Sequence, residues 1–220
     1  DVLFILDFNA SHRAGDRVGE WIEKSNAAKI LIDHHQQPDE FDFVYSDTTQ
    51  PATAQMVFQF AKALAPETPI SEEVAKCLYT GIMTDTGGFR FRSTSALTHK
   101  IIAELIEAGA NPAEITSNTW DTHTISRLHL LSLVLGRIEL VAENSIAILW
   151  LKRDELKKFG FEKGDTEGFV NYGLSLLGVE MSAFFMEDLY EDFIKISFRS
   201  KNAVDVNQFS RKYFNGGGHI

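Results

Sequence analysis

The sequence predicts an α/β fold in two parts, each built around its own sheet. Short uninterrupted apolar runs at residues 2–6 and 29–32 are typical of buried parallel strands. The segment between them has helical spacing, and the pattern changes after about residue 140, where further short strands are predicted. A parallel sheet with helices, followed by a smaller α/β domain, accounts for all three observations.

The first part alternates strands with helices. VLFIL at residues 2–6 and KILI at residues 29–32 are predicted strands. Between them, residues 15–25 place Val18 and Ile22 at helical spacing. Strand, helix and strand in about 30 residues form a βαβ unit, whose two strands run parallel.

Three more helices are predicted in this part, at residues 51–65, 71–87 and 95–109. Pro51 lies near the first turn of the first helix, where its missing amide hydrogen costs nothing. Acidic residues begin the second helix, where the helix dipole favours them. Gly109 ends the third helix and is followed by Asn111-Pro112, which cannot continue it.

The second part begins after a mainly helical stretch. We predict a first domain at residues 1–124, a helical linker at residues 125–140 and a smaller α/β domain at residues 141–220. In this last domain the strands are expected at residues 146–151, 181–186 and 193–198, and the helices at residues 166–177 and 204–214.

Composition restricts the class of protein. The chain has 220 residues, a formal charge of -10 and one cysteine, Cys77. One cysteine excludes a disulfide framework within the chain and favours the reducing cytoplasm. The sequence has no run of eighteen apolar residues, so no membrane-spanning helix is predicted. The negative charge argues against a protein that coats long duplex nucleic acid, but not against one that binds a small phosphorylated ligand.

Polar side chains follow both strands of the predicted βαβ unit. Asp7 comes after the first strand, and Asp33, His34 and His35 end the second. In parallel sheets, ligands bind at the carboxyl ends of strands. Taken singly, Asp7 is more typical of a loop opening, whereas the triplet is as consistent with a metal site as with a polar strand end.

A third polar feature ends the helix predicted at residues 71–87. Asp85 is followed by Gly87 and Gly88, which allow a tight turn and a close approach to a ligand. An acid at a helix C-terminus opposes the dipole, so a cation nearby would explain it. Arg90 follows the glycines and is a candidate for contacting substrate or, equally, a surface residue.

The second domain contains candidate phosphate-binding residues. Gly216, Gly217 and Gly218 could present consecutive amide hydrogens to phosphate oxygens, and His219 adds a side-chain donor. Arg199 ends a predicted strand and could clamp a phosphate with two hydrogen bonds. A flexible linker and a solvated arginine are the ordinary alternatives.

In this order, the stretches ILIDHH, YTGIMTDTGGFRF, KISFRS and FNGGGH resemble the DHH phosphoesterase family. The resemblance is strongest to the NrnA-like branch of oligoribonucleases and pAp phosphatases. It implies a parallel-sheet DHH domain, a helical linker and a DHH-associated domain that binds substrate.

The resemblance also implies roles for individual residues. Asp7, His34 and Asp85 would be metal ligands, with Asp7 between two ions. His35 would contact the scissile phosphate, and Asp33 would orient the histidines. The residues implied to hold the nucleotide from the second domain are Arg199, Gly216, Gly217, Gly218 and His219.

The function implied is hydrolysis of very short RNA (nanoRNA) or of small nucleotides such as pAp, with water attacking phosphorus directly. Two Mn²⁺ ions would activate the water, with Mg²⁺ or Co²⁺ as substitutes; carboxylate and imidazole ligands favour Mn²⁺ over Mg²⁺. The alternatives are a cyclic or linear dinucleotide phosphodiesterase and, if the chain is complete, a non-catalytic nucleotide-binding module. A homodimer is possible.

The sequence departs from the family in two places. The family's earlier motif, a His and two Asp residues after an initial strand, is absent. Phe8-Asn9 also stands where a small pair such as Cys-Gly is expected. We therefore expect the chain to be part of a longer protein that supplies the remaining metal ligands.

Overall fold

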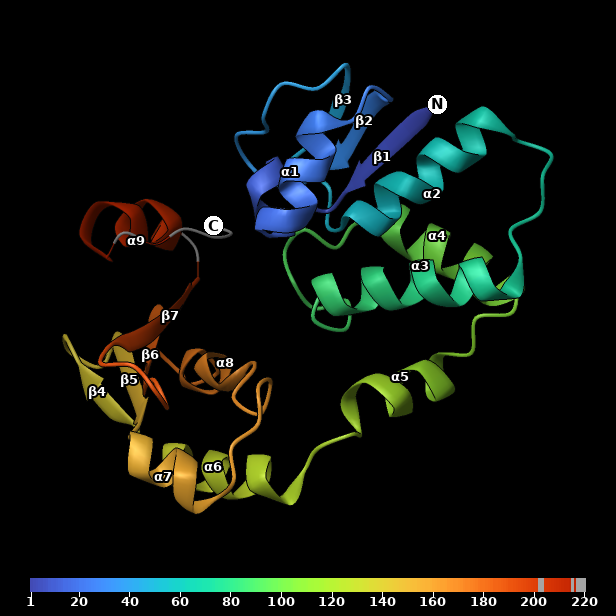
Figure 1. Ribbon diagram of the computed structural model, residues 1–220. Coiled ribbons are helices and arrows are strands. Elements are labelled where there is room, and N and C mark those ends of the chain that lie inside the picture. The colour runs from blue at the N-terminus through green and yellow to red at the C-terminus, as the bar shows by residue number, and fades with distance from the viewer. Residues whose placement is uncertain (202–203, 215, 217–220) are drawn as a thin grey trace. The chain divides into compact units, whose positions relative to one another are not determined.

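A computed structural model of the chain describes residues 1–201, 204–214 and 216. The chain forms two compact units, Asp1–Thr119 and Trp120–Ile220, each with its own sheet and core (Figure 1). The unit boundary lies a few residues before the predicted start of the linker. Each unit is described by itself.

The sheet of unit 1 is parallel, as predicted. Its order is β1 (Val2–Leu6), β2 (Ala28–Asp33) and β3 (Phe43–Ser46). Ile5 pairs with Leu31, and Leu31 pairs with Val44, which brings the three strands to a common end. The strand β3 was not predicted because it is short, lies at the sheet edge and exposes Phe43 and Val44, so it lacks the buried apolar run of the other two.

The four helices predicted in unit 1 are confirmed as α1 (Asp16–Lys24), α2 (Thr53–Leu64), α3 (Glu72–Asp85) and α4 (Ala96–Glu107). The structure adds the short η1 (Ser11–Ala14), which was not predicted, and α5 (Pro112–Trp120), which lies in the stretch expected to be mainly helical. The hydroxyl of Ser71 caps α3 by accepting from the amide of Val74. Ser95 and Thr98 cap α4 reciprocally.

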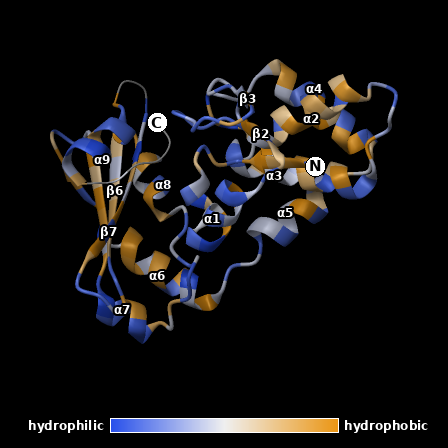
Figure 2. Ribbon diagram, turned by 45° about the horizontal axis from the view of Figure 1, so that its top comes forward, coloured by the Kyte–Doolittle hydropathy of each residue, from blue (hydrophilic) through white to orange (hydrophobic). Residues whose placement is uncertain are grey.

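Two apolar clusters hold unit 1 together. The first joins α2, α3 and α4 through Phe58, Ile82 and Leu105, and the second joins β1 to α1 and β2 through Ile5, Ile22 and Leu31. The helices α2 and α4 carry both hydrophobic and hydrophilic residues, as amphipathic helices do (Figure 2). The first cluster fixes the end of α3, where Asp85 lies.

Unit 2 contains a mixed four-stranded sheet of order β4-β5-β6-β7. Its elements are α6 (Ile125–Leu135), β4 (Glu139–Val141), β5 (Ile146–Leu151), α7 (Arg153–Lys158), α8 (Phe169–Leu174), β6 (Met181–Glu187), β7 (Ile194–Ser200) and α9 (Val206–Phe214). The strands β5 and β6 are parallel, and the other two pairs are antiparallel.

Two elements of unit 2 were not predicted. The strand β4 has three residues and turns into β5 through Ala142, Glu143 and Asn144, all of which have positive φ. The helix α7 has six residues, too few for a helical repeat to be recognised. The predicted strands at 146–151, 181–186 and 193–198 are confirmed as β5, β6 and β7.

The helix α6 differs from the linker predicted at residues 125–140. Its Leu130 and Val134 are fully buried and pack with Leu149, Phe169 and Phe184 in the core of unit 2. Residues 139–141 form β4 rather than a continuation of the helix. The helix therefore belongs to unit 2, because its apolar face needs the sheet to cover it.

Two expectations from composition concern the surface. Cys77 is exposed and unpaired in α3. Within the described ranges, every helix is too short or too polar to cross a membrane.

Candidate metal centre

The strands β1 and β2 bring Asp7 and His34 to the same edge of the sheet. Asp7 follows β1, and its backbone amide donates to the carbonyl of Ile32 at 3.3 Å. His34 follows β2 directly. Asp7 has a φ of 66°, a left-handed conformation that aspartate tolerates better than most residues. Because the two strands are neighbours and parallel, their polar ends meet.

A hydrogen bond to the main chain orients His34. Its Nδ1 lies 3.1 Å from the carbonyl oxygen of Gln50. A carbonyl can only accept, so Nδ1 carries a hydrogen, and in the neutral ring Nε2 then has the lone pair that could bind a metal. That Nε2 lies 3.8 Å from a carboxylate oxygen of Asp7 and 3.8 Å from one of Asp85. One imidazole nitrogen and two carboxylates therefore converge.

Asp85 is the last residue of α3 and is partly buried. Burial raises the pKa of its carboxyl, and repulsion from Asp7 raises this pKa further, while His34 and His35 lower it. The chain leaves α3 through Gly87, whose φ of 57° suits glycine. Two acids that repel each other and lie near the same imidazole nitrogen fit a site for a cation.

Asp33 holds His35. The Nδ1 of His35 lies 2.6 Å from one carboxylate oxygen of Asp33, and the backbone amide of His35 donates to the other oxygen at 3.0 Å. Asp33 is fully buried and His35 is 9% exposed. A buried carboxylate that accepts both hydrogens fixes the ring, with Nε2 on the side away from Asp33.

The donor atoms of three residues are close enough for one ion. Asp7, His34 and His35 each offer an atom within 4.8 Å of the others. Carboxylates combined with imidazoles suit Mn²⁺, Co²⁺ or Zn²⁺ better than Mg²⁺, so the residues fit a transition-metal site. His35 is thus close enough to Asp7 and His34 to bind the same ion, although the sequence predicted that it contacts the substrate. Its role stays a prediction.

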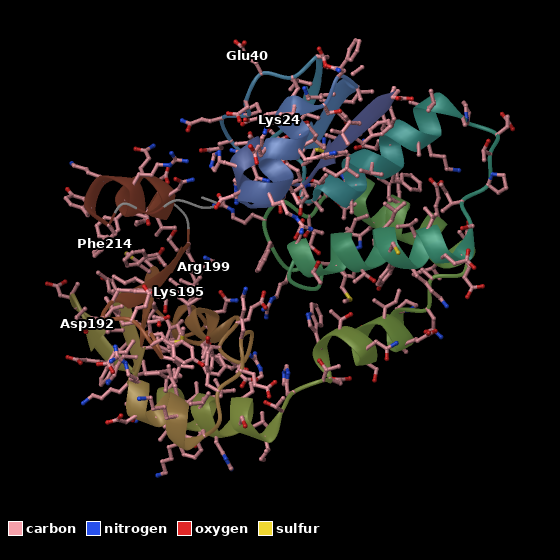
Figure 3. The ribbon with its side chains drawn as sticks, in the orientation of Figure 1. Lys24, Glu40, Asp192, Lys195, Arg199 and Phe214 are labelled. Carbon is pink, nitrogen blue, oxygen red and sulfur yellow. The ribbon has the colours of Figure 1, made fainter. Side chains whose placement is uncertain are left out.

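The structure locates some of the predicted substrate-binding residues. Arg199 lies in β7, where its Nη1 donates to the carbonyl of Phe198 at 2.9 Å (Figure 3). Arg90 is exposed in unit 1, with its guanidinium 5.9 Å from the ring centre of Phe91. The amide of Gly216 donates to the carbonyl of Ser210.

Three of the predicted substrate-binding residues, Gly217, Gly218 and His219, lie outside the described residues. A Cβ added at Gly216 would meet the hydroxyl of Ser210, which would have to turn away. The structure therefore brings together the five predicted residues of unit 1 that end strands and a helix: Asp7, Asp33, His34, His35 and Asp85. The substrate-binding roles stay predictions.

The sequence did not indicate Gln50 or Asp47. The side chain of Asp47 accepts from the amide and the hydroxyl of Thr49, a turn that Asp-Thr-Thr could have predicted. Gln50 contacts His34 through its backbone carbonyl, which every residue has. Only the pairing of β2 with β3 shows that this turn lies beside the histidines.

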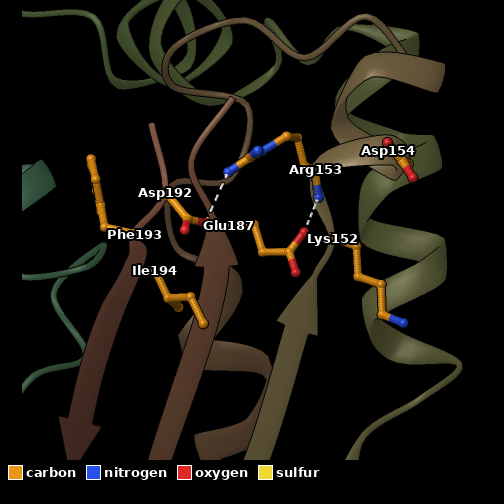
Figure 4. A pocket seen from close by; sticks show the side chains of 7 residues that line it. All are labelled: Lys152, Arg153, Asp154, Glu187, Asp192, Phe193 and Ile194. Carbon is orange, nitrogen blue, oxygen red and sulfur yellow. Dashed lines mark hydrogen bonds and ion pairs between the residues drawn. The ribbon is translucent and has the colours of Figure 1, made fainter. Parts of the chain in front are cut away.

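A separate hollow of about 700 Å³ lies in unit 2 and involves none of the predicted site residues (Figure 4). It is lined by Lys152, Arg153, Asp154, Glu187, Asp192, Phe193 and Ile194. Arg153 donates to the carbonyls of Asp188 and Glu191 and lies 3.9 Å from Asp192. These contacts explain the shape of the loop between β6 and β7.

Asp85→Asn is expected to stabilise the metal-free protein. The pKa of Asp85 is raised in the folded state, so the free energy of unfolding falls as pH rises through that pKa, and ionised Asp85 is a penalty at neutral pH. We expect the melting temperature in EDTA to rise by roughly 1–4 °C. Added Mn²⁺ is expected to raise the melting temperature of the wild type, and this rise should be smaller in the Asp85→Asn variant. Thermal unfolding at pH 7 measures both.

The exposed acid Asp121 provides the control. Asp121→Asn removes the same charge from a residue of unit 2 and should change neither melting temperature nor response to Mn²⁺. A lower melting temperature for Asp85→Asn in EDTA would show that the carboxylate is stabilised by its surroundings, contrary to the argument from burial and repulsion.

Comparison with known proteins supports the resemblance. Residues 1–82 match the DHH family, N-terminal domain. The chain is 30% identical over 206 residues to the bifunctional oligoribonuclease and PAP phosphatase NrnA of Bacillus subtilis (strain 168), a match that covers 93% of the chain. It is 31% identical over 192 residues to the protein of the same description from Thermus thermophilus, covering 87% of the chain. The chain spans 64% and 56% of the lengths of these two relatives.

A solved structure supports the fold. A crystal structure of an exopolyphosphatase-related protein from Bacteroides fragilis matches with a TM-score of 0.93 and 38% sequence identity. The match covers 100% of this chain and 64% of that one. The predicted α/β fold is thereby confirmed.

Proposed function

We propose that the chain, whose residues 1–82 match the DHH family, is part of a metal-dependent phosphoesterase that hydrolyses short oligoribonucleotides or small nucleotides such as pAp. The observation that carries the proposal is the convergence of Asp7, His34 Nε2 and Asp85 from three different elements. The descriptions of the two curated relatives, each an oligoribonuclease and PAP phosphatase, support the substrate class. The single cysteine supports a cytoplasmic enzyme.

The metal we propose is Mn²⁺, bound as two ions, with Mg²⁺ or Co²⁺ as substitutes. Asp7, His34 and Asp85 would hold it, because their donors are the carboxylates and imidazole that Mn²⁺ accepts. A divalent cation supplies positive charge that neutralises phosphate and lowers the pKa of water. Without it, the negative charges of Asp7 and Asp85 would repel a phosphate ester.

The chain's own residues would then position the substrate. With Nδ1 of His35 held by Asp33, Nε2 is the nitrogen available to a phosphate oxygen. To donate to a phosphate oxygen, this nitrogen would have to carry a hydrogen of its own, and the carboxylate of Asp33 on the other side of the ring suits an imidazole with a hydrogen on both nitrogens. We propose that Arg90 in unit 1 and residues of unit 2 hold the rest of the nucleotide. The proposed residues of unit 2 are Arg199, Gly216, Gly217, Gly218 and His219.

Arg199→Ala is expected to raise KM for the nucleotide by about 10- to 100-fold with a smaller change in kcat, because a charged hydrogen bond to phosphate contributes about 1.5–3 kcal/mol. Lys195→Ala is a matched control, since Lys195 lies on the same strand, four residues away and on the same face (Figure 3). Steady-state kinetics with pAp measures both variants. An unchanged KM for Arg199→Ala would mean that Arg199 is a surface residue.

One assay tests the proposed function. The full-length protein is incubated with pAp, a linear dinucleotide, a cyclic dinucleotide and a five-nucleotide RNA, each with Mn²⁺ and with EDTA. We expect Mn²⁺-dependent hydrolysis of pAp or of the linear substrates. Binding of nucleotide with no turnover of any substrate would instead support a non-catalytic nucleotide-binding module, and turnover of the cyclic dinucleotide alone would change the substrate class.

A further inference from the structure

A chain of side-chain hydrogen bonds reaches from α2 to the carbonyl that holds His34. The side chain of Gln50 donates from Nε2 to Asp47 Oδ2 at 2.9 Å, and its Oε1 lies 2.9 Å from Nε2 of Gln55. We propose that Gln55, acting through Gln50, is a positioning residue that sets the ring orientation and tautomer of His34. The inference rests on the proposed metal site, because only there does the orientation of His34 Nε2 matter.

The direction of every bond in this chain is determined by Asp47. An ionised carboxylate can only accept, so Gln50 must present its amide nitrogen to Asp47 and its oxygen to Gln55. Hydrogen bonds from Thr49 and from Gln50 lower the pKa of Asp47, in agreement with an ionised acid. Gln55 therefore has to donate to Gln50, and neither amide can be reversed without breaking a bond.

The same chain restrains the backbone of Gln50. The amide of Asp47 donates to the carbonyl of Asp33 at 3.2 Å, and the amide of Gln50 donates to the carbonyl of Asp47 at 3.2 Å. These bonds attach one side of the turn to the end of β2. Gln55, in the first turn of α2, attaches the other side. Hydrogen bonds to two elements, β2 and α2, thus hold the Gln50 carbonyl beside His34.

The side chain of Gln55 lowers the stability of the fold at its position. It is 1% exposed, and among the described residues its Oε1 is buried with no hydrogen-bond partner. A buried amide with an unused acceptor destabilises a fold, and an apolar residue of similar size would remove that cost. Residues that lower the stability of a fold are expected at functional sites. The hydrogen bond to Gln50 is the contact that explains a glutamine here.

The neighbouring Gln59 supplies a matched control. It lies one helical turn further along α2, and its Oε1 is also buried without a partner in the described part of the chain. It takes no part in the bonds between Asp47, Gln50 and Gln55. Gln55→Leu and Gln59→Leu therefore make the same chemical change at adjacent turns, and only one of them interrupts the path to His34.

The test uses the full-length protein and two readouts. In the metal-free state, proton–nitrogen correlation spectra of the imidazoles report the His34 tautomer. The wild type and Gln59→Leu should show hydrogen on Nδ1, whereas Gln55→Leu should show a mixture. Calorimetry with Mn²⁺ should then give about tenfold weaker binding for Gln55→Leu alone, at the lower end of effects seen for residues that orient metal ligands. Its melting temperature in EDTA should not fall.

Either of two results would overturn the inference: an unchanged His34 tautomer and Mn²⁺ affinity in Gln55→Leu, or a lower melting temperature with unchanged affinity, which would make Gln55 merely structural. If Gln55→Leu does not fold, Gln50→Met breaks the same path and should show the same two changes. If the wild type binds no Mn²⁺, the proposed function fails, while the metal-free tautomer comparison still decides whether Gln55 positions His34.

Discussion

Replacing His35 with alanine is expected to lower kcat by about 100- to 10,000-fold while bound Mn²⁺ stays near the wild-type content. The reason is the geometry of its ring: Asp33 lies 2.6 Å from Nδ1, so Nε2 is the nitrogen that would face the phosphate, whose charge grows during attack. Removing the ring would remove that stabilisation and leave Asp7, His34 and Asp85 intact. Turnover of pAp and metal content, measured on the same preparation, test the prediction.

The measurement of metal content decides between two roles for His35. A nitrogen of its ring lies within 4.8 Å of possible ligand atoms of Asp7 and His34, so His35 could bind the same metal ion instead of the substrate. Loss of metal in His35→Ala would assign it as a ligand and contradict the predicted role. His123→Ala removes an exposed histidine elsewhere and should leave both metal and turnover unchanged.

The parts of the fold that could be predicted are those with a strong local pattern. The strands β1 and β2 are uninterrupted apolar runs, and α3 and α4 have caps and a buried face. The strands β3 and β4 lack such a pattern because both are short and largely exposed. The start of α6 was predicted correctly, but its end and its place in the core of unit 2 were not, since an apolar helix face does not indicate which sheet will cover it.

The candidate site shows the same division. Asp7, Asp33, His34 and Asp85 could be predicted as candidates because ligands bind at the carboxyl ends of parallel strands, and because an acid at the end of a helix opposes the helix dipole. The hydrogen bonds that orient His34 could not be predicted from the sequence. Its partner is a main-chain carbonyl, and the glutamine that steadies this carbonyl is reached through two further hydrogen bonds. Such contacts depend on how β2, β3 and α2 meet, which a linear pattern does not record.

His34→Ala is expected to remove Mn²⁺ binding almost completely, and turnover with it. Its Nε2 lies equally far, 3.8 Å, from Asp7 and Asp85, so it would be the imidazole ligand that joins the two acids into one site. At a Mn²⁺ concentration 100 times Kd, binding stabilises the wild type by about 2.7 kcal/mol. For a chain of this size, that corresponds to a rise in melting temperature of about 5–10 °C. The variant should show no such rise.

The comparison between EDTA and Mn²⁺ isolates the metal from the fold. His34→Ala leaves the carbonyl of Gln50 without its donor, which costs about 1–3 kcal/mol in both conditions alike. Only the difference between the conditions reports the ion, and the same His123→Ala control should retain the full rise. A variant at His34 that still gains stability from Mn²⁺ would place the ion on other ligands. It would also remove the basis for expecting Gln55 to influence metal affinity, because that influence passes through His34 alone.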